Sequence, residues 1–334
     1  MVILEQLAAP IVLAPLAGGP STPALAAAVS DAGGLGFLGA GYLTPEALSD
    51  RLRETQSLTP RPVGVNLFVI SGGPTPPVTY AAYVESLRAE AEHFGVAVGE
   101  PRFDDDHFDA KVAALVEQPV AVVSFSFGLP PAHAAEQLRS VGSEIWITVT
   151  SSDEARRAAV AGADVLVVQG AEAGGHRGSF EDHDSSPMPL VELIQEVRAE
   201  VDLPRVGAGG IATAEHVTRA LDAGAAAAAA GTAFMLAPEA GTSAVHREAI
   251  ASGTPTALTR AFTGRLARGI RNRFMLDHAG APSAYPEIHY ATAPIRAAGR
   301  AAGDADVINL WAGTRHALTV ARPAADTVCA LTPS

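Results

Sequence analysis

One histidine in this chain stands where it could do chemistry next to a bound ligand. The apolar run "DVLVV" (164–168) is followed directly by "QGAEAGGHRG" (169–178), so His176 lies behind Gly174 and Gly175 at the end of a predicted strand. Glycines have no side chain, and the backbone there can approach a planar ligand closely. An imidazole at this point could act as a general acid or base, or donate a hydrogen bond to an anion, near neutral pH. The competing interpretation is a solvated histidine in an ordinary turn, so a catalytic role for His176 needs support from other residues.

Two glycine-rich turns predict a phosphate site. "VGAGGIAT" (206–213) lies between a predicted strand and a helix, and "AAGT" (229–232) ends the next strand. Free backbone N–H groups and the positive end of a helix favour a phosphate, and turns after consecutive late strands of a barrel form such a site. The candidate contacts here are Ala208, Gly209, Gly210, Ala229, Ala230, Gly231 and Thr232.

A third turn and two amides could bind the flat ring of such a ligand. "APLAGGPST" (14–22) contains Pro15, Ala17, Gly18 and Gly19, which are small enough for backbone to pack against a ring. Asn66 interrupts "GVNLFV" and Gln169 ends "VLVVQ". Their amides could donate to and accept from the polar edge of a flavin. The alternatives are an ordinary strand-to-helix turn and backbone capping by the two amides.

The elements that must position these residues follow an alternating pattern. Short apolar runs begin at residues 11, 34, 62, 120, 145, 164, 204 and 225, with helix-length segments between them. Thr22 before one segment and Ser151 or Ser152 before another are typical N-caps. The run "AAAAAAG" favours helix by propensity, but "TAEHVTRALDAG" just before it already completes a helix, so we predict a strand. Eight strand and helix units predict an α/β fold, a (β/α)₈ TIM barrel.

The pattern also divides the chain. We expect the barrel in residues 1–237 and a helical lid over its C-terminal face in residues 238–299, where the alternation stops. Residues 300–334 are expected to pack back on the barrel. Residues 71–95 are a second insertion, after the third strand. Loops at the carboxyl ends of barrel strands build the site, so both insertions are expected to frame it.

Composition excludes several classes of function. A net charge of −13 argues against binding nucleic acid or an anionic membrane, because either partner would be repelled. The single cysteine, Cys329, rules out an internal disulfide framework, and we interpret it as an inert thiol in a cytoplasmic protein. The apolar run at 223–237 is shorter than the ~20 residues that span a bilayer. A homodimer is one possible assembly.

Three polar clusters have simpler explanations than a metal-binding or substrate-binding site. "DDDHFD" (104–109) resembles a magnesium motif, but it opens an amphipathic helix whose dipole it complements, so we predict no metal. "EDHDSSP" (181–187), with His183, is interpreted as a solvated loop and helix cap. "RLARGIRNRF" (265–274) could guide an anionic substrate or form an exposed helical face.

Several of these segments together resemble one family. They are "APLAGGPSTPALAAAVSDAGGLGFL", "GVNLF", "VVSFSFG", "VVQGAEAGGHRG", "GAGGI", "AAAGTAFMLAPEAGTSAVHREA", "TRAFTGRLARGI" and "NLWAG". From about Pro10 to Gly313 the chain resembles the bacterial class I nitronate monooxygenases, formerly called 2-nitropropane dioxygenases. "GGHRG" combined with "APLAGG" is the specific part, since the glycine turns alone also fit enoyl reductases.

The resemblance implies an FMN-binding barrel that oxidises alkyl nitronates with O₂ to a carbonyl product and nitrite, propionate-3-nitronate being the typical substrate. It places flavin contacts on Asn66, Gln169, Gly174, Gly210 and residues 229–232. It makes His176 the catalytic histidine. Tyr285 and Gly19 are candidates for the substrate pocket. One departure is Ala228 and Ala229, where relatives often carry valine and a polar residue, which puts any side-chain contact at Ala229 in doubt.

Other functions remain open at this stage. An enoyl reductase or an NADH:quinone reductase could use the same fold, although the chain has no second dinucleotide fingerprint. A barrel that binds a phosphorylated metabolite would use the same glycine turns without redox chemistry. A flavin carrier without catalysis would not need His176.

Overall fold

Eight parallel strands curve round into a barrel in the computed structural model, which describes residues 3–182 and 187–333. Their order is β1-β9-β8-β6-β5-β4-β3-β2, and a bridge between Val12 and Leu35 joins β1 to the segment leading into β2. The strands are β1 (Ile11–Leu13), β2 (Gly36–Gly39), β3 (Val63–Phe68), β4 (Val122–Ser126), β5 (Glu144–Val149), β6 (Val165–Gln169), β8 (Arg205–Ala208) and β9 (Ala227–Ala230). The predicted (β/α)₈ barrel is confirmed.

Helices surround the outside of the barrel. They are α1 (Pro23–Asp31), α2 (Pro45–Leu58), α5 (Phe108–Glu117), α6 (Ala132–Ser140), α7 (Ser152–Val160), α8 (Leu190–Glu200), α9 (Ala214–Ala223) and α13 (Ala324–Leu331). The predicted caps are confirmed: Thr22 Oγ1 accepts from Leu25 N at 3.0 Å, and Ser151 Oγ accepts from Glu154 N at 3.2 Å. The C-terminal helix α13 packs against α1 and α9.

The polyalanine strand β9 is buried on both faces. Ala227 and Ala229 face the barrel interior, where they pack in a cluster with Phe37 and Trp146. Ala228 and Ala230 face the helices. A strand covered on both sides needs apolar residues throughout, and alanine meets that need although its propensity favours helix. The strand prediction for this run is confirmed.

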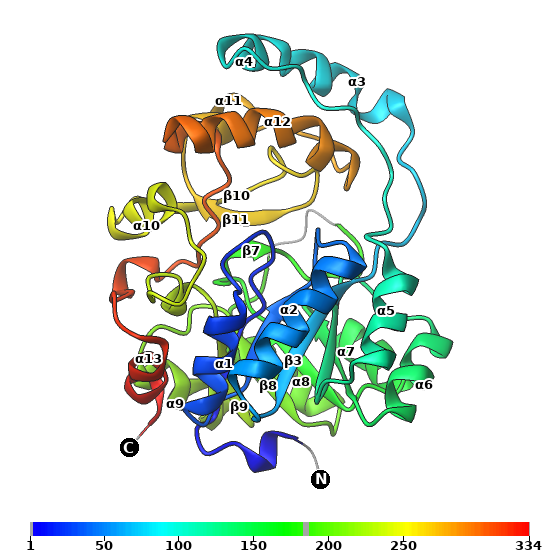
Figure 1. The fold of residues 1–334 in the computed structure, drawn as a ribbon, viewed down its shortest axis with the longest axis vertical. Helices are drawn as coiled ribbons and strands as arrows, with labels where there is room; N and C mark the ends of the chain where they lie inside the picture. Colours follow the sequence, from blue (N-terminus) through cyan, green and yellow to red (C-terminus); the bar gives the residue numbers. More distant parts are fainter. Residues whose placement is uncertain (1–2, 183–186, 334) are drawn as a thin grey trace.

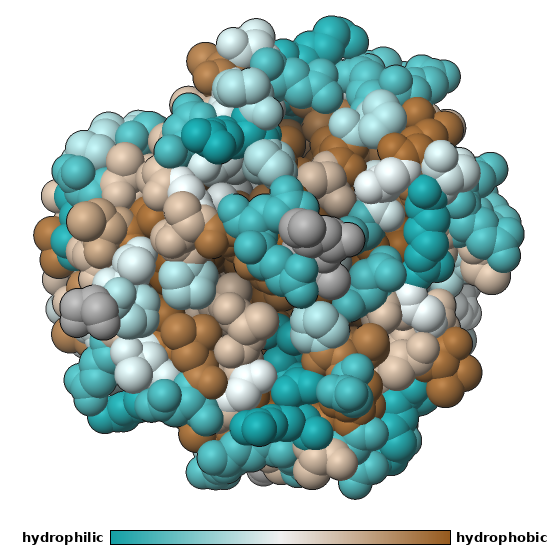
Figure 2. All heavy atoms as spheres, turned by 90° about the horizontal axis from the view of Figure 1, so that it is seen from below, coloured by the Kyte–Doolittle hydropathy of each residue, from teal (hydrophilic) through white to brown (hydrophobic). Residues whose placement is uncertain are grey.

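The end of the barrel opposite the cap is closed by the N-terminal segment. The short helix η1 (Ile3–Gln6) lies under the strands, and Ile3 N donates to Glu144 Oε1 at 2.6 Å. The other oxygen of Glu144 accepts from Trp146 Nε1 at 3.0 Å. Both termini lie at this end (Figure 1), and Figure 2, seen from there, shows hydrophilic and hydrophobic residues interspersed over the surface.

A cap covers the other end of the barrel (Figure 1). Its elements are β7 (Gly175–His176), α3 (Pro77–Ser86), α4 (Arg88–His93), η2 (Thr232–Phe234), α10 (Ala244–Ala251), β10 (Thr256–Thr259), β11 (Ala267–Ile270), α11 (Arg273–Asp277), α12 (Glu287–Ala302), η3 (Ala305–Val307) and η4 (His316–Leu318). The cap has its own apolar core, in which Leu87 and Ala91 of the 71–95 insertion join Phe262, Phe274 and Ile288. The helical lid therefore also contains a three-stranded sheet, β10-β11-β7.

Of the two alternatives for residues 265–274, the exposed helical face is wrong. Residues Ala267–Ile270 form β11, which is antiparallel to both β10 and β7. Arg265 is only 8% exposed, and its guanidinium donates to the backbone carbonyls of Arg177 and Ser179. Pairing with the neighbouring strand β10 and with the distant strand β7 overrides the helix propensity of the arginines. Arg271 and Arg273 lie at the surface, and Arg273 forms a 2.7 Å ion pair with Glu90.

In the acidic motif at 104–109, Asp109 lies in the first turn of α5 as expected, whereas Asp106 has a different role. Asp106 is 8% exposed and forms a 2.7 Å ion pair with Lys111, while its Oδ1 accepts from Tyr42 N at 2.8 Å. Within the described ranges no group of histidine, cysteine or acidic residues is arranged to hold a metal ion. His183 lies outside the described residues.

Two further features of the described chain bear on its setting. None of its helices is both long and apolar enough to cross a membrane. The thiol of Cys329 is exposed.

Candidate active site

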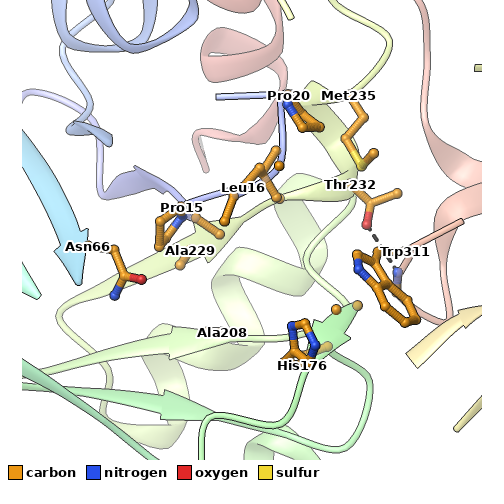
Figure 3. Close-up of a pocket in the computed structure, with 18 of the residues that line it drawn as sticks. Pro15, Leu16, Pro20, Asn66, His176, Ala208, Ala229, Thr232, Met235 and Trp311 are labelled. Carbon is orange, nitrogen blue, oxygen red and sulfur yellow. Dashed lines mark hydrogen bonds between the residues drawn. The ribbon is translucent and has the colours of Figure 1, made fainter. Parts of the chain in front are cut away.

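A cavity of ≈ 450 Å³ lies where the carboxyl ends of the barrel strands meet the cap. Figure 3 shows that Asn66, His176, Thr232 and Trp311, which come from four separate segments, are arranged around it. The predicted residues that line it are Pro15, Ala17, Gly18, Asn66, Gln169, Gly174, Gly175, His176, Ala208, Gly209, Gly210, Ala229, Gly231 and Thr232. The fold therefore brings predicted residues from Pro15 to Thr232, which lie far apart in the chain, onto one cavity.

Three predicted residues do not line the cavity. Ala230 is buried toward the helices because side chains alternate along β9. Gly19 faces a carbonyl oxygen of the cap rather than the cavity. Tyr285 stands behind the wall: its hydroxyl lies 3.2 Å from that of Tyr42, and its ring centroid is 5.8 Å from that of His176.

Both glycines before the histidine are required by geometry. A Cβ at Gly174 would come within 2.4 Å of the carbonyl carbon of Ala312, so no side chain fits there. Gly175 has φ +74°, a left-handed conformation that favours glycine, and no atom lies within 4 Å of the place where its Cβ would be. The next residue, His176, pairs with Ala267 of β11. The histidine is therefore held by the cap sheet and is not part of a free loop.

The side chain of Gln169 fixes the same segment. Its Nε2 donates to His176 O at 3.0 Å, and its Oε1 accepts from Gly178 N at 2.8 Å. Arg177 adds a bond from its guanidinium to Gly170 O at 2.7 Å. In this structure Gln169 lines the cavity, and its hydrogen bonds orient the backbone on both sides of Arg177.

Asn66 is buried on the barrel wall. It is 3% exposed, and its Nδ2 donates to Ser124 Oγ at 2.9 Å and to Ser126 Oγ at 3.2 Å. Its Oδ1 has no hydrogen-bond partner among the residues that the structure describes. That oxygen is available to accept from an N–H group of a ligand in the cavity.

His176 is neutral in this environment. Burial, together with the positive charges of Arg265 and Arg296, lowers its pKa to about 3. Its Nε2 lies 2.9 Å from Thr263 Oγ1, and that hydroxyl lies 3.3 Å from Arg265 O, to which it donates. A hydroxyl that donates to the carbonyl accepts from Nε2–H, which leaves Nδ1 as the unprotonated nitrogen of the ring.

Aromatic rings surround this histidine. Its centroid lies 5.7 Å from that of Phe127 and 5.5 Å from that of Trp311. Tyr42 forms part of the same wall and stacks on His289 with centroids 4.2 Å apart. Tyr42 and Phe127 have φ of 69° and 77°, which is rare for residues with side chains and costs about 1–2 kcal/mol each. The buried Asp106 stabilises the strained Tyr42 by accepting its N–H.

The opposite end of the cavity is built from the two late glycine turns. Gly209 and Gly210 have φ of 121° and 67°, and they precede α9, which Thr213 caps. Arg315, which the sequence did not point to, donates from NH1 to Gly210 O at 2.7 Å. The hydroxyl of Thr232 accepts from the backbone at residue 313, drawn as a dashed line in Figure 3.

The charge of the cavity is opposite to that of the chain. The net charge of the chain is −13, yet no aspartate or glutamate lines the cavity in the described parts of the chain, whereas Arg296, Arg300 and Arg315 do. Such a cavity attracts anions and does not repel them.

Other side chains line the cavity without having been predicted as site residues: these arginines, Tyr42, Phe127, Thr263, His289, Asn309 and Trp311. Tyr42 lies three residues after β2 and Phe127 directly after β4, at the end of the strands where barrel sites lie, so that signal could have found them. Thr263, Asn309 and Trp311 lie in segments that carry the family resemblance, but those segments do not show which of their side chains reach the cavity.

Comparison with known proteins gives one consistent family. The family model described as "Nitronate monooxygenase" matches residues 3–334. A nitronate monooxygenase of Pseudomonas aeruginosa is 38% identical over 331 residues, which cover 95% of this chain and 93% of the relative. A probable nitronate monooxygenase of Staphylococcus aureus is 35% identical, over 94% and 91% of the two chains.

Solved structures agree. A nitroalkane oxidase from Streptomyces ansochromogenes superposes with a TM-score of 0.96 at 42% identity and covers 99% of this chain and 96% of its own. FabK from Thermotoga maritima superposes with a TM-score of 0.75 at 25% identity, over 99% of this chain and 93% of its own.

Proposed function

This chain belongs to the nitronate monooxygenase family of oxidoreductases, and we propose that it binds FMN in the cavity and oxidises alkyl nitronates of the propionate-3-nitronate type. The proposed reaction uses O₂ and yields a carbonyl product and nitrite. The observation that carries the proposal is a cavity of ≈ 450 Å³ that joins a neutral, partly buried histidine to two glycine turns and whose lining, among the described residues, has arginines but no carboxylates.

The residues of the cavity fit FMN. Its dianionic phosphate would bind at Gly209, Gly210 and Thr232, where backbone N–H groups are concentrated and Arg315 supplies the charge. Its ring would pack against the turn that contains Gly18, because this left-handed glycine, like Gly175, has open space where a side chain would be. The unpartnered Asn66 Oδ1 suits the N–H group of the ring edge. The proposed contacts of Pro15, Ala17, Gly174, Ala208, Ala229 and Gly231 line the same surface.

When bound, FMN supplies the redox chemistry, taking electrons from the nitronate and passing them to O₂. The residues of the chain bind and orient the substrate. His176, neutral because of its burial, presents an unprotonated Nδ1 that removes the proton from the carbon next to the nitro group when a nitroalkane binds in place of its nitronate. Phe127 and Trp311 shield this imidazole from water, and the ring of Tyr285 packs against Phe127 and His176.

The proposed setting is the cytoplasm. An exposed cysteine that is the only one in 334 residues is typical of a reducing compartment. The anionic nitronate and O₂ are the proposed partners of the site.

The test is to identify the cofactor and the product in one preparation. The purified protein is expected to be yellow, to release FMN on denaturation, and to form nitrite from propionate-3-nitronate in air. His176→Asn should keep the FMN and lose most of the turnover, because the glycine turns and not the histidine hold the cofactor. A colourless protein, or a yellow one that forms no nitrite, contradicts the proposal.

A further inference from the structure

The cap contributes two arginines to the cavity that have no carboxylate partner within residues 3–182 and 187–333. Arg296 of α12 is 7% exposed, and Arg300 lies one turn further along the same helix. The guanidinium of Arg296 donates to Thr292 Oγ1 at 3.0 Å, to His289 O at 2.8 Å and to Asn309 Oδ1 at 3.3 Å. All three acceptors are neutral.

The second arginine uses the same neutral oxygen. Arg300 donates to Asn309 Oδ1 at 3.3 Å, so that one amide oxygen is shared by two cations. No salt bridge joins Arg296 or Arg300 to a carboxylate in residues 3–182 or 187–333. Burial lowers the pKa of Arg296 to about 10, so this group still carries its charge at pH 7. A buried cation without a counter-ion is costly to the fold, and an anionic ligand would relieve that cost.

These arginines belong to the chamber of the proposed catalytic histidine. The charge of Arg296 is one of the causes that lower the pKa of His176. His289, which accepts from Arg296, stacks on Tyr42, and the hydroxyl of Tyr42 lies 3.2 Å from that of Tyr285 beside His176. One small molecule could therefore place its reacting carbon near His176 and an anionic tail on Arg296. The third arginine of the lining, Arg315, is bonded to the glycine turn at Gly210 and belongs to the phosphate end.

We propose that Arg296, assisted by Arg300, binds a carboxylate on the substrate and makes this enzyme selective for carboxylate-bearing nitronates over neutral alkyl nitronates. The inference rests on the proposed function and adds a specificity residue to it. A guanidinium attracts a carboxylate by its charge, and the N–H groups of Arg296 and Arg300 that their neutral acceptors leave free can donate to it. The neutral acceptors around Arg296 hold the guanidinium in place without cancelling its charge.

The test compares two nitronates of equal chain length. Propionate-3-nitronate carries a carboxylate where propyl-1-nitronate carries a methyl group, and the readout is the ratio of their kcat/KM values with the FMN-loaded enzyme. The wild type should favour the carboxylate, and Arg296→Gln should reduce the ratio by about 100-fold, as expected when one partner of a buried charge pair is removed. Arg296→Lys keeps the charge and should retain part of the preference. Arg88→Gln, an exposed surface arginine, should leave both rates unchanged.

Binding of succinate provides a readout that does not depend on turnover. Succinate has the shape of propionate-3-nitronate and is not oxidised, and its affinity, measured by calorimetry, should fall by a similar factor in Arg296→Gln. A wild type that oxidises neither nitronate refutes the proposed function, whereas succinate binding still decides the role of Arg296. An unchanged ratio and unchanged succinate affinity in Arg296→Gln overturn the inference.

If Arg296→Gln does not fold, the same two measurements are made on Arg300→Gln and Arg296→Lys, and unchanged values in both variants overturn the inference. If Arg296→Gln lowers the affinity for NADPH and leaves that for succinate unchanged, the inference is also overturned, because Arg296 would then bind a phosphate and not a carboxylate.

Discussion

The buried, neutral state of His176 predicts a specific dependence of stability on pH. A histidine has an ordinary pKa of 6.5, and burial and the charge of Arg265 lower that of His176 to about 3 in the folded protein. Below pH 6.5 the unfolded chain therefore binds a proton at this residue that the folded chain does not bind. Stability falls as the pH drops through this window, and between pH 7 and pH 5 the loss from His176 alone is about 2 kcal/mol.

Urea unfolding of the FMN-loaded protein at pH 7, 6 and 5 measures this loss. His176→Asn removes the titrating group, so its free energy of unfolding should fall by about 2 kcal/mol less over the same range than that of the wild type. His246 and His289 are also buried, but they are present in both proteins and their contributions cancel in the comparison. His133→Asn, at an exposed position on α6, should behave like the wild type. Equal losses in the wild type and in His176→Asn would refute the argument that this imidazole is kept neutral by burial.

Three further changes test other parts of the site. Gly210→Asp should yield protein without FMN after desalting, because a side chain at this left-handed glycine would come within 2.5 Å of Arg315 and bring a carboxylate to the phosphate; a normal flavin content would show that the phosphate binds elsewhere. Arg315→Gln should weaken FMN binding by about 10- to 100-fold in a fluorescence titration of the apoprotein, and an unchanged affinity would remove this arginine from the site. Asp106→Asn leaves Lys111 buried and unpaired and should cost about 3–5 kcal/mol in urea unfolding, whereas a loss below 1 kcal/mol would contradict the buried ion pair.

The barrel could be predicted from the sequence because its signals are local. A parallel strand covered on both faces reads as an apolar run, and turns such as the one at Gly209 and Gly210 need glycine for their own backbone conformation. The same reasoning located His176 and most of the proposed FMN contacts on one cavity. The prediction that Ala230 lines the cavity was wrong because the sequence of β9 alone does not show which of its alternating side chains point to the helices.

The cap could not be predicted in the same detail because its contacts are distant in the sequence. Ala267 pairs with His176, 91 residues earlier since 267 − 176 = 91, and no local pattern announces such a pairing. Arg296 lies on an ordinary amphipathic helix, and only the packing of that helix over the barrel makes it part of the site. The acidic motif at 104–109 predicts only a complement to the helix dipole, because the sequence does not show that Asp106 and Lys111 are buried together.

The central claim is that this cavity lets a nitronate reduce the bound flavin. The most direct measurement mixes the purified protein, without oxygen, with propionate-3-nitronate and separately with NADH, and records the visible spectrum of the flavin. The account predicts that the nitronate changes the flavin absorbance and that NADH does not. Reduction by NADH alone would contradict it and would place this chain among the flavin reductases, with His176 orienting a different substrate.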